Sequence, residues 1–212
     1  MGHKVSPISF RLGGIQDWRS KWFVKKSYKK ILKEDVMLRD YILKKFSSGG
    51  ISRIDIERSA NQIVFIIHSS RPGIMIGRGG EGAEKLREEL KKKMDDPKIE
   101  VKVNIEEVKV PWLDANFATQ YIKEQLEKRI GFRRTLKQAL KQIVDARAKG
   151  AKVMVSGRLD GSEMSRKEWL AQGRLPLNTF RADVDFAGNE ADTKYGKVGI
   201  KVWIYKGEVF LK

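Results

Sequence analysis

The residues best suited to chemistry form a glycine-rich cluster near the middle of the chain. Gly77, Gly79 and Gly80 surround Arg78, directly after the apolar step at residues 74–76. Glycine lets another backbone approach closely and adopts turn conformations that other residues avoid. If the cluster joins two short helices, N–H groups at a helix end face the same space and favour an anion. The pattern therefore predicts a G-x-x-G loop that binds phosphate, with Arg78 as a cation at its tip.

The same region also satisfies G-x-G-x-x-G through Gly77, Gly79 and Gly82, the bare pattern of a dinucleotide-binding turn. That site needs a strand running directly into the turn and an acidic residue about twenty positions later, at the end of the next strand. Pro72 interrupts the chain before the glycines, and the acidic pair beginning at Asp95 stands in a turn that ends a helix. A phosphate-binding P-loop is excluded because no Gly-Lys is followed by Ser or Thr. An ordinary turn remains the alternative for the glycines taken alone.

A second candidate is a basic face on a helix expected from Phe132 to about Ala148. At about 100° per residue, four basic residues fall on one side of this helix and four apolar residues on the other. The basic residues are Arg133, Arg134, Lys137 and Lys141, and the apolar residues are Leu136, Ala139, Leu140 and Ile143. A solvated charged face is the usual interpretation. No acidic residue lies between Glu127 and Asp145 to neutralise the cluster, which favours a polyanionic partner.

Catalytic and metal sites have weaker support. Asp183 and Asp185 project from one face of a predicted strand and could suggest a two-metal nuclease, but no third ligand has a spacing that joins them. The chain has no Cys, and its two histidines are His3 and His68. We therefore expect no catalytic centre, no metal site and no cofactor.

One aromatic pair could bind bases. Trp203 and Tyr205 share a predicted strand face with Lys201, and a base could stack on their rings. Packing against a neighbouring helix or protein is the favoured alternative.

The composition also points to nucleic acid. The 212 residues carry a formal net charge of +17, and 41% of them are hydrophobic, enough for a real core. The basic excess lies in residues 1–50 and 110–212, while residues 51–109 are nearly balanced. Such a surface attracts polyanions at cellular ionic strength. An anionic membrane would attract the same charge, but we expect no membrane binding because no apolar run approaches the length of a membrane-spanning helix.

The first half of the chain predicts the elements that position the glycine loop. Residues 1–20 lack a sustained period and predict an extended basic arm that becomes ordered on RNA. Beyond it, apolar spacing predicts one or two helices over residues 22–46, a hairpin with strands near residues 53–57 and 63–67, the glycine loop, a helix over residues 83–94 and a strand over residues 99–105.

The second half predicts a different arrangement after a boundary at Pro111. Asp114 can cap its first helix, and Gly131 can end it. The expected elements are helices over residues 115–130 and 132–148, a strand at residues 153–155, a polar segment over residues 162–170, and strands at residues 180–186 and 198–204. This order predicts an α/β (α+β) fold in which two helices precede a largely antiparallel sheet.

Five sequence motifs resemble those of a known protein family. They are M-G-H-K-V-S-P at the start with R-L-G from Arg11, R-P-G-I-M-I-G-R-G-G from Arg71, F-R-R-T-L-K from Phe132, V-S-G-R-L from Val155 and Y-G-x-x-G-x-K-V-W-I from Tyr195. The G-x-x-G loop in its order of elements resembles the bacterial, type II K-homology (KH) RNA-binding domain. Taken together, the motifs strongly resemble the family of the third protein of the small ribosomal subunit.

The resemblance implies a type II KH domain over residues 21–109 and a second α/β domain over residues 110–212, after an arm of residues 1–20. It implies a structural, non-enzymatic protein of the subunit head that binds ribosomal RNA. The protein would line the channel where messenger RNA (mRNA) enters, and would help to hold and open incoming mRNA during translation. In that family, residues matching Arg133, Arg134 and Lys137 face the mRNA path.

The implied partners are ribosomal RNA, mRNA and neighbouring proteins of the head and the channel, with no membrane and no small-molecule substrate. The expected location is the ribosome in the cytoplasm. We expect these residues to bind RNA: Lys4, Arg11, Gly77, Arg78, Gly79, Gly80, Arg133, Arg134, Lys137, Lys141 and Arg158. A KH regulator that binds messenger or small RNA outside the ribosome is the alternative, and the nuclease is a third class.

Overall fold

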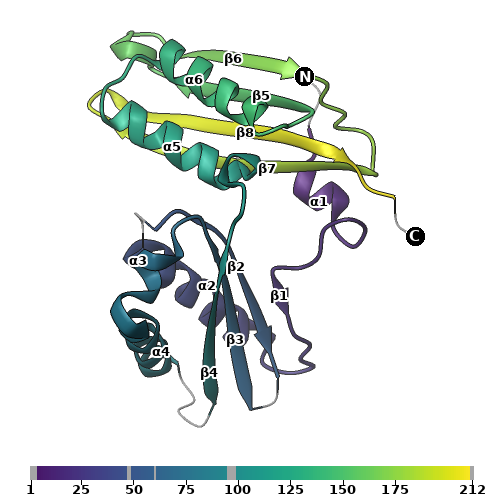
Figure 1. The fold of residues 1–212 in the computed structure, drawn as a ribbon, viewed down its shortest axis with the longest axis vertical. Helices are drawn as coiled ribbons and strands as arrows, with labels where there is room; N and C mark the ends of the chain where they lie inside the picture. Colours follow the sequence, from purple (N-terminus) through teal and green to yellow (C-terminus); the bar gives the residue numbers. More distant parts are fainter. Residues whose placement is uncertain (1–3, 47–48, 60, 95–98, 211–212) are drawn as a thin grey trace. The chain divides into compact units, whose positions relative to one another are not determined.

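The computed structural model describes residues 4–46, 49–59, 61–94 and 99–210 of the chain. The chain forms two compact units (Figure 1). The central unit is Trp18–Lys109, and the terminal unit combines Met1–Asp17 with Val110–Lys212. His3 and the acidic pair at Asp95 and Asp96 lie outside the described residues. No described helix is both long enough and apolar enough to cross a membrane.

The central unit is a four-stranded sheet with helices packed against it. Its elements are β1 (Ser20–Lys21), α2 (Tyr28–Lys45), β2 (Ile51–Arg58), β3 (Gln62–Ser69), α3 (Pro72–Ile76), a 3-10 turn η1 (Arg78–Gly80), α4 (Glu81–Lys93) and β4 (Glu100–Glu107). The strand order is β1-β2-β3-β4. Strands β2 and β3 are antiparallel, which confirms the predicted hairpin, and β4 runs parallel to β3.

Alternation along β3 explains where the core of the central unit lies. Ile63, Phe65 and Ile67 are each at most 1% exposed, and the residues between them are partly exposed. This period of two is what a strand with one buried face requires. Leu86 and Leu90 of α4 are fully buried in the same core. The apolar stripes predicted on these elements therefore meet in one core.

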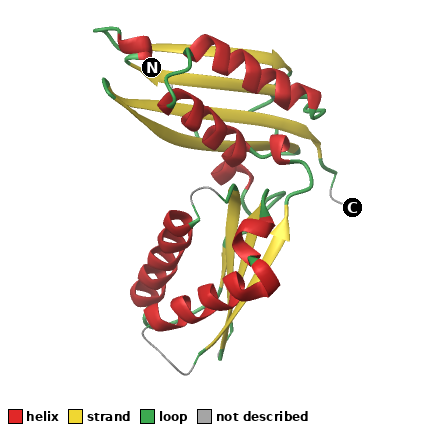
Figure 2. Cartoon of the chain, turned by 60° about the vertical axis from the view of Figure 1, so that its left-hand side comes forward, coloured by secondary structure: helices red, strands yellow, loops and turns green. Residues whose placement is uncertain are grey.

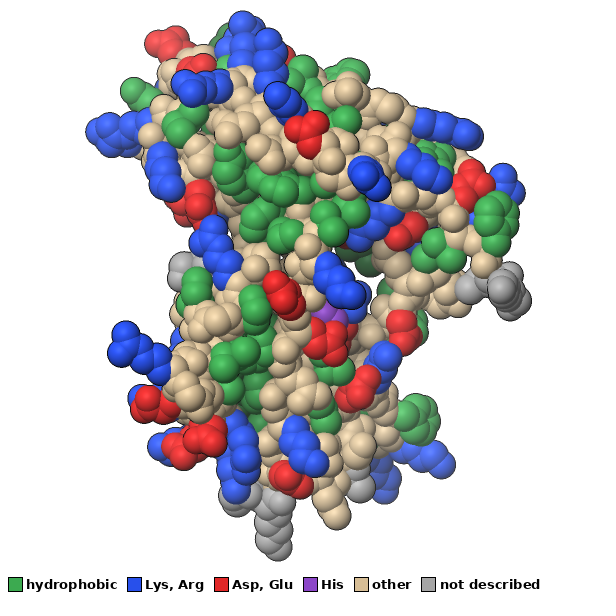
Figure 3. All heavy atoms as spheres, viewed as in Figure 1, with side chains coloured by type: hydrophobic (Ala, Val, Ile, Leu, Met, Phe, Trp, Pro, Cys, Tyr) green, Lys and Arg blue, Asp and Glu red, His purple; other side chains and the backbone are tan. Residues whose placement is uncertain are grey.

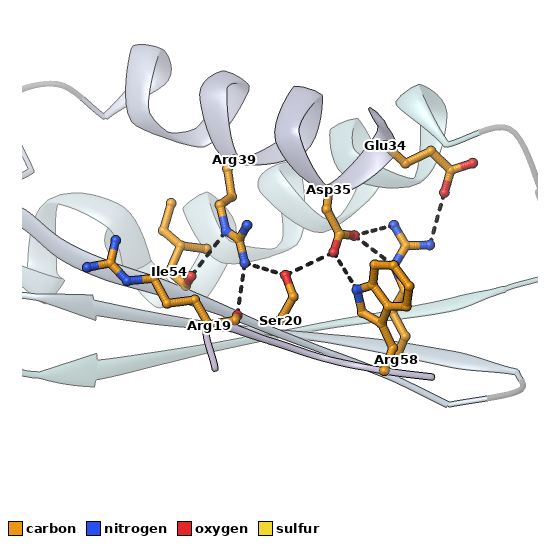
Figure 4. Close-up of polar contacts among 8 residues, drawn as sticks. Arg19, Ser20, Glu34, Asp35, Arg39, Ile54 and Arg58 are labelled. Carbon is orange, nitrogen blue, oxygen red and sulfur yellow. Dashed lines mark hydrogen bonds and ion pairs between the residues drawn. The ribbon is translucent and has the colours of Figure 1, made fainter. Parts of the chain in front are cut away.

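A buried carboxylate links three elements of the central unit (Figure 4). Asp35 of α2 is 0% exposed and accepts hydrogen bonds from the Trp22 indole (2.8 Å) and the Ser20 hydroxyl (3.1 Å). Arg58 of β2 pairs with Asp35 at 2.6 Å and with Glu34 at 2.9 Å. A buried charge is tolerated when it is paired and hydrogen-bonded in this way. The network fixes β1 and the following residues to α2 and β2.

The terminal unit is an antiparallel sheet with two helices on one face (Figure 2). Its elements are α1 (Pro7–Arg11), a 3-10 turn η2 (Pro111–Leu113), α5 (Ala115–Glu127), α6 (Phe132–Asp145), β5 (Gly150–Gly157), a 3-10 turn η3 (Leu159–Gly161), β6 (Arg166–Gly173), β7 (Ala182–Thr193) and β8 (Gly196–Glu208). The strand order is β6-β5-β8-β7. The mixed α/β class predicted from the sequence is confirmed, with helices and antiparallel sheet in the C-terminal region.

Strand β6 occupies part of the region for which the sequence predicts only a polar segment, residues 162–170. Its residues pair in register with β5, from Gly150 opposite Gly173 to Gly157 opposite Arg166. Strand β6 lies at the edge of the sheet, and most of its side chains are exposed. It therefore lacks the apolar alternation that marks a half-buried strand.

The N-terminal residues also correct a prediction. Residues 7–11 form helix α1, which begins with Pro7 at its first position and packs against β7. Phe10 of this helix stacks on Phe180, with ring centroids 4.0 Å apart. Residues 7–11 of the expected extended arm are thus folded onto the terminal unit, because α1 has an aromatic side chain and a buried arginine to anchor it.

Candidate nucleic-acid interface

The G-x-x-G loop of the central unit connects α3 to α4. Gly77, Gly79 and Gly80 have φ angles of +70°, +64° and +87°, in the region that favours glycine. A Cβ atom at Gly79 or Gly80 would meet no other atom within 4 Å. The glycines are needed for the backbone conformation, and the space in front of the loop is open. Arg78 is exposed at the tip, as the sequence predicts.

The surroundings of the loop suit an anion. Gly80 is the N-cap residue of α4 and provides no side-chain hydrogen bond to the first turn. Amide groups at a helix start attract a phosphate because the helix dipole is positive there. Ile74 and Ile76 of α3 are 51% and 37% exposed beside the loop, and they offer apolar contacts to unpaired bases.

Gly82 has a different role, which the sequence interpretation missed. A Cβ atom at this position would lie 2.6 Å from the carbonyl oxygen of Met75 and 2.9 Å from that of Ile76. Gly82 therefore allows the first turn of α4 to pack directly against the end of α3. The third glycine of the G-x-G-x-x-G pattern serves helix packing, and no strand runs directly into the turn.

The basic face predicted on α6 is present in the terminal unit. Arg133, Arg134, Lys137 and Lys141 are all exposed, whereas Phe132, Leu136, Ala139, Leu140 and Ile143 are at most 8% exposed. Within the described part of the chain, no carboxylate forms an ion pair with any of these four cations. In Figure 3, several Lys and Arg side chains lie on the surface over α6. The helix thus presents uncompensated positive charge to solvent.

A further cation joins this face from a neighbouring strand. The guanidinium carbon of Arg166, at the start of β6, lies 5.7 Å from the centre of the Phe132 ring. The guanidinium carbon of Arg133 lies at the same distance from that ring. Both arginines are therefore held near the N-terminal end of α6. The sequence interpretation missed Arg166 because it placed this residue in a polar segment and predicted no strand there.

Arg158 lies at the same end of the terminal unit. It lines a pocket of about 550 Å³ together with Phe132, Arg129, Lys194 and Tyr195. The Nε group of Arg158 donates to the carbonyl of Ser162 at 2.9 Å, and its guanidinium carbon lies 5.7 Å from the Tyr195 ring centre. Its side chain is exposed and partly fixed by these contacts. The structure brings Arg158 close to the start of α6, although 25 positions separate it from Arg133 in the sequence.

Arg11 is a correction to the predicted RNA-binding residues. Its side chain is 2% exposed, so it cannot reach a phosphate. The guanidinium instead donates hydrogen bonds to the carbonyl oxygens of Pro7, Pro176, Leu177, Thr179 and Ala182. Arg11 thereby joins α1 to the segment before β7 and to β7 itself. Lys4, by contrast, is exposed and stays an RNA-binding candidate.

The weaker constellations have structural explanations. The Asp185 carboxylate accepts from the backbone N–H of Ala115 at 3.0 Å and lies 3.5 Å from the Lys206 ammonium. Among the described residues, no group of three or more His, Cys, Asp or Glu side chains could hold a metal ion. Tyr205 is only 4% exposed and packs against Ala182 and Val184, so it cannot stack on a base.

The fold and these surfaces define a class of protein: a KH domain followed by a second α/β domain with a basic helix. Comparison with known families agrees. Residues 37–113 match the KH domain family, and residues 122–204 match the family described as ribosomal protein S3, C-terminal domain.

Full-length relatives identify the family. A small ribosomal subunit protein uS3 from Desulforamulus reducens is 51% identical over 210 residues, which cover 99% of this chain and 94% of the relative. Proteins of the same name from Anaeromyxobacter sp. (strain Fw109-5) and Listeria welshimeri are 50% and 48% identical, each across 99% of this chain and 92% and 94% of the relative. The chain belongs to the uS3 family of small ribosomal subunit proteins. These relatives are ribosomal proteins and not enzymes, as predicted.

Proposed function

We propose that the chain binds ribosomal RNA in the head of the small subunit and also holds mRNA where it enters. In this proposal the G-x-x-G loop binds RNA backbone through Gly77, Gly79 and Gly80, with Arg78 as its cation. The basic face of α6 binds the incoming message. Neighbouring proteins of the head and of the channel complete its surroundings.

One observation carries the mRNA part of the proposal. Arg133, Arg134, Lys137 and Lys141 lie exposed on one face of α6, and no carboxylate among the described residues pairs with them. Neutralising RNA phosphates releases bound counterions, so such a face binds RNA strongly and without regard to sequence. A helix buried along its opposite face holds these cations on a rigid surface. Holding separated strands there would favour the opening of downstream RNA structure.

A triple alanine variant of Arg133, Arg134 and Lys137 tests this role. In reconstituted translation, subunits carrying the variant should read through a stable messenger hairpin more slowly, while an unstructured message should be little affected. The charge-conserving variant R133K/R134K/K137R is the matched control and should stay close to wild type. Normal incorporation with equal speed on both messages would reject the role in mRNA binding.

A binding measurement separates electrostatic contact from other effects. For single-stranded RNA, each lost phosphate contact flattens the log-log salt dependence of affinity by roughly 0.7, so the triple alanine variant should reduce the slope by about 2. If these residues bind ribosomal RNA instead, the variant should enter subunits poorly and should translate both messages equally badly.

A further inference from the structure

The sheet of the terminal unit has a second face, opposite α5 and α6. Strand alternation and the register of the ladders place its residues: Lys152 lies opposite Trp203 and Ala171, while Met154 lies opposite Trp169 and Lys201. Helix α1 and residues 174–181 pack at one end of this face, around Tyr205 and Val184, and Trp203 lies against the edge of that cluster. We call the remaining part the lysine–tryptophan face; it consists of Lys152, Met154, Lys167, Trp169, Phe186, Lys201 and Trp203.

Aromatic side chains form the centre of the lysine–tryptophan face. Trp169 is 56% exposed, an unusual state for so large an apolar side chain. The rings of Phe186 and Trp203 lie 5.2 Å apart at 39°. The Lys152 ammonium lies 4.5 Å from the Trp169 ring centre and 5.7 Å from that of Trp203. One cation is therefore held between the two tryptophans.

The charges of this face lack internal partners. Among the described residues, none of Lys152, Lys167 and Lys201 forms an ion pair with a carboxylate. By alternation along β7, the carboxylates of Glu190 and Asp192 share this side of the sheet beyond the face, and Glu190 is already paired with Lys197 at 3.1 Å. The face is thus apolar at its centre, with three cations available to an anionic partner.

The geometry favours a protein partner over RNA. A base stacks on a flat, accessible ring, but the Lys152 ammonium already lies against Trp169 and Trp203, and Phe186 packs at a tilt on Trp203. Exposed tryptophan with neighbouring Met and Phe is typical of the centre of a protein interface.

We propose that the lysine–tryptophan face docks a protein segment of the small subunit that presents apolar side chains to Trp169 and carboxylates to Lys152, Lys167 and Lys201. The apolar side chains would cover the tryptophan edge, while the carboxylates would complete the cation pairs. This proposal needs the ribosomal family assignment but not the mRNA role of α6.

Zero-length carbodiimide crosslinking of purified small subunits tests the proposal, since it joins an ammonium only to a carboxylate in contact with it. We expect peptides containing Lys152, Lys167 or Lys201 joined to Asp or Glu of another subunit protein. The internal Lys197–Glu190 pair controls for reactivity. If that control forms and none of the three lysines yields an intermolecular product, or if ultraviolet light joins Trp169 to RNA, the proposal is wrong.

An exchange experiment adds a second readout. Trp169→Ala should leave the melting temperature of the free protein nearly unchanged, because the side chain is more than half exposed, and should release the protein from subunits at lower salt than wild type. Phe23→Ala is the matched control, because the Phe23 side chain is 85% exposed between β1 and α2 and lies outside the surfaces proposed to bind RNA or protein. Equal salt resistance for both variants and wild type would contradict docking at this face. Neither readout depends on Arg133, Arg134 or Lys137, so failure here is distinct from failure of the mRNA role.

Discussion

Replacing Arg11 with Met removes the guanidinium and keeps most of the side-chain length. The structure assigns Arg11 to the stability of the terminal unit, because its three nitrogen groups serve five backbone carbonyls at a site that is 2% exposed. The bonds to Ala182 and Pro7 are buried, and the other three are partly buried, so water can replace some of those three.

These contacts set the expected loss in the free energy of unfolding. A hydrogen bond from a charged group contributes about 1.5–3 kcal/mol, and a buried carbonyl left without a donor costs a similar amount. Counting mainly the two buried bonds, Arg11→Met should lower the free energy of unfolding by roughly 3–5 kcal/mol. For a domain of this size that corresponds to a fall in melting temperature on the order of 10 °C or more.

Calorimetry of the free protein measures the stability, and RNA titration at several salt concentrations measures phosphate contact. We expect a large fall in the melting temperature of the terminal unit, with no change in the salt slope for protein that is still folded. Lys4→Met is the control, since Lys4 is exposed and should leave stability unchanged. Wild-type stability for Arg11→Met, together with a flatter salt dependence, would refute the buried role and restore Arg11 as an RNA-binding residue.

Three further predictions concern single sites. Asp35→Ala should destabilise the central unit by roughly 3–5 kcal/mol, because it leaves the Arg58 guanidinium without its buried partner. Denaturant unfolding measures this change, and a loss of unfolding free energy below about 1 kcal/mol would contradict the network in Figure 4. Gly79→Asp should weaken crosslinking of RNA to the loop far more than Gly79→Asn, since Asp and Asn both tolerate positive φ and differ in charge. Equal crosslinking for the two variants would mean that the loop is only a turn. Burial raises the pKa of Asp183, although the nearby Lys206 opposes this shift, so the ionised carboxylate destabilises the fold at neutral pH. Asp183→Asn should therefore raise the melting temperature at neutral pH, and this gain should vanish as the pH falls below the ordinary Asp pKa. An equal gain at all pH values would contradict this cause.

Local signals in the sequence were sufficient to predict the helices and turns that position the candidate site. Asp114, predicted as a helix cap, accepts hydrogen bonds from the backbone N–H groups of Asn116 (2.7 Å) and Phe117 (3.1 Å). The basic and apolar faces of α6 were predictable because residues on one helix face recur every three or four positions. The glycine loop was predictable because only glycine adopts its φ angles without strain.

Contacts between distant residues were not predictable in the same way. Four of the five carbonyl groups that accept hydrogen bonds from Arg11 lie more than 160 positions away, and a carbonyl carries no sequence signature. Strand β6 was not predicted because an exposed edge strand shows no alternation of apolar and polar residues. Asp35 did leave a signal: it lies between Ile31 and Leu38 on the apolar stripe of α2, where a charged residue indicates a buried partner.

Crosslinking in assembled subunits can test the proposed contact between α6 and the message. A messenger carrying photoreactive nucleotides downstream of the decoding position, bound to subunits that contain this chain, should form crosslinks to a peptide spanning residues 133–141. The charge-conserving variant should keep these crosslinks, and the triple alanine variant should lose most of them. Crosslinks from this peptide only to ribosomal RNA, with none to the message, would show that α6 does not bind mRNA.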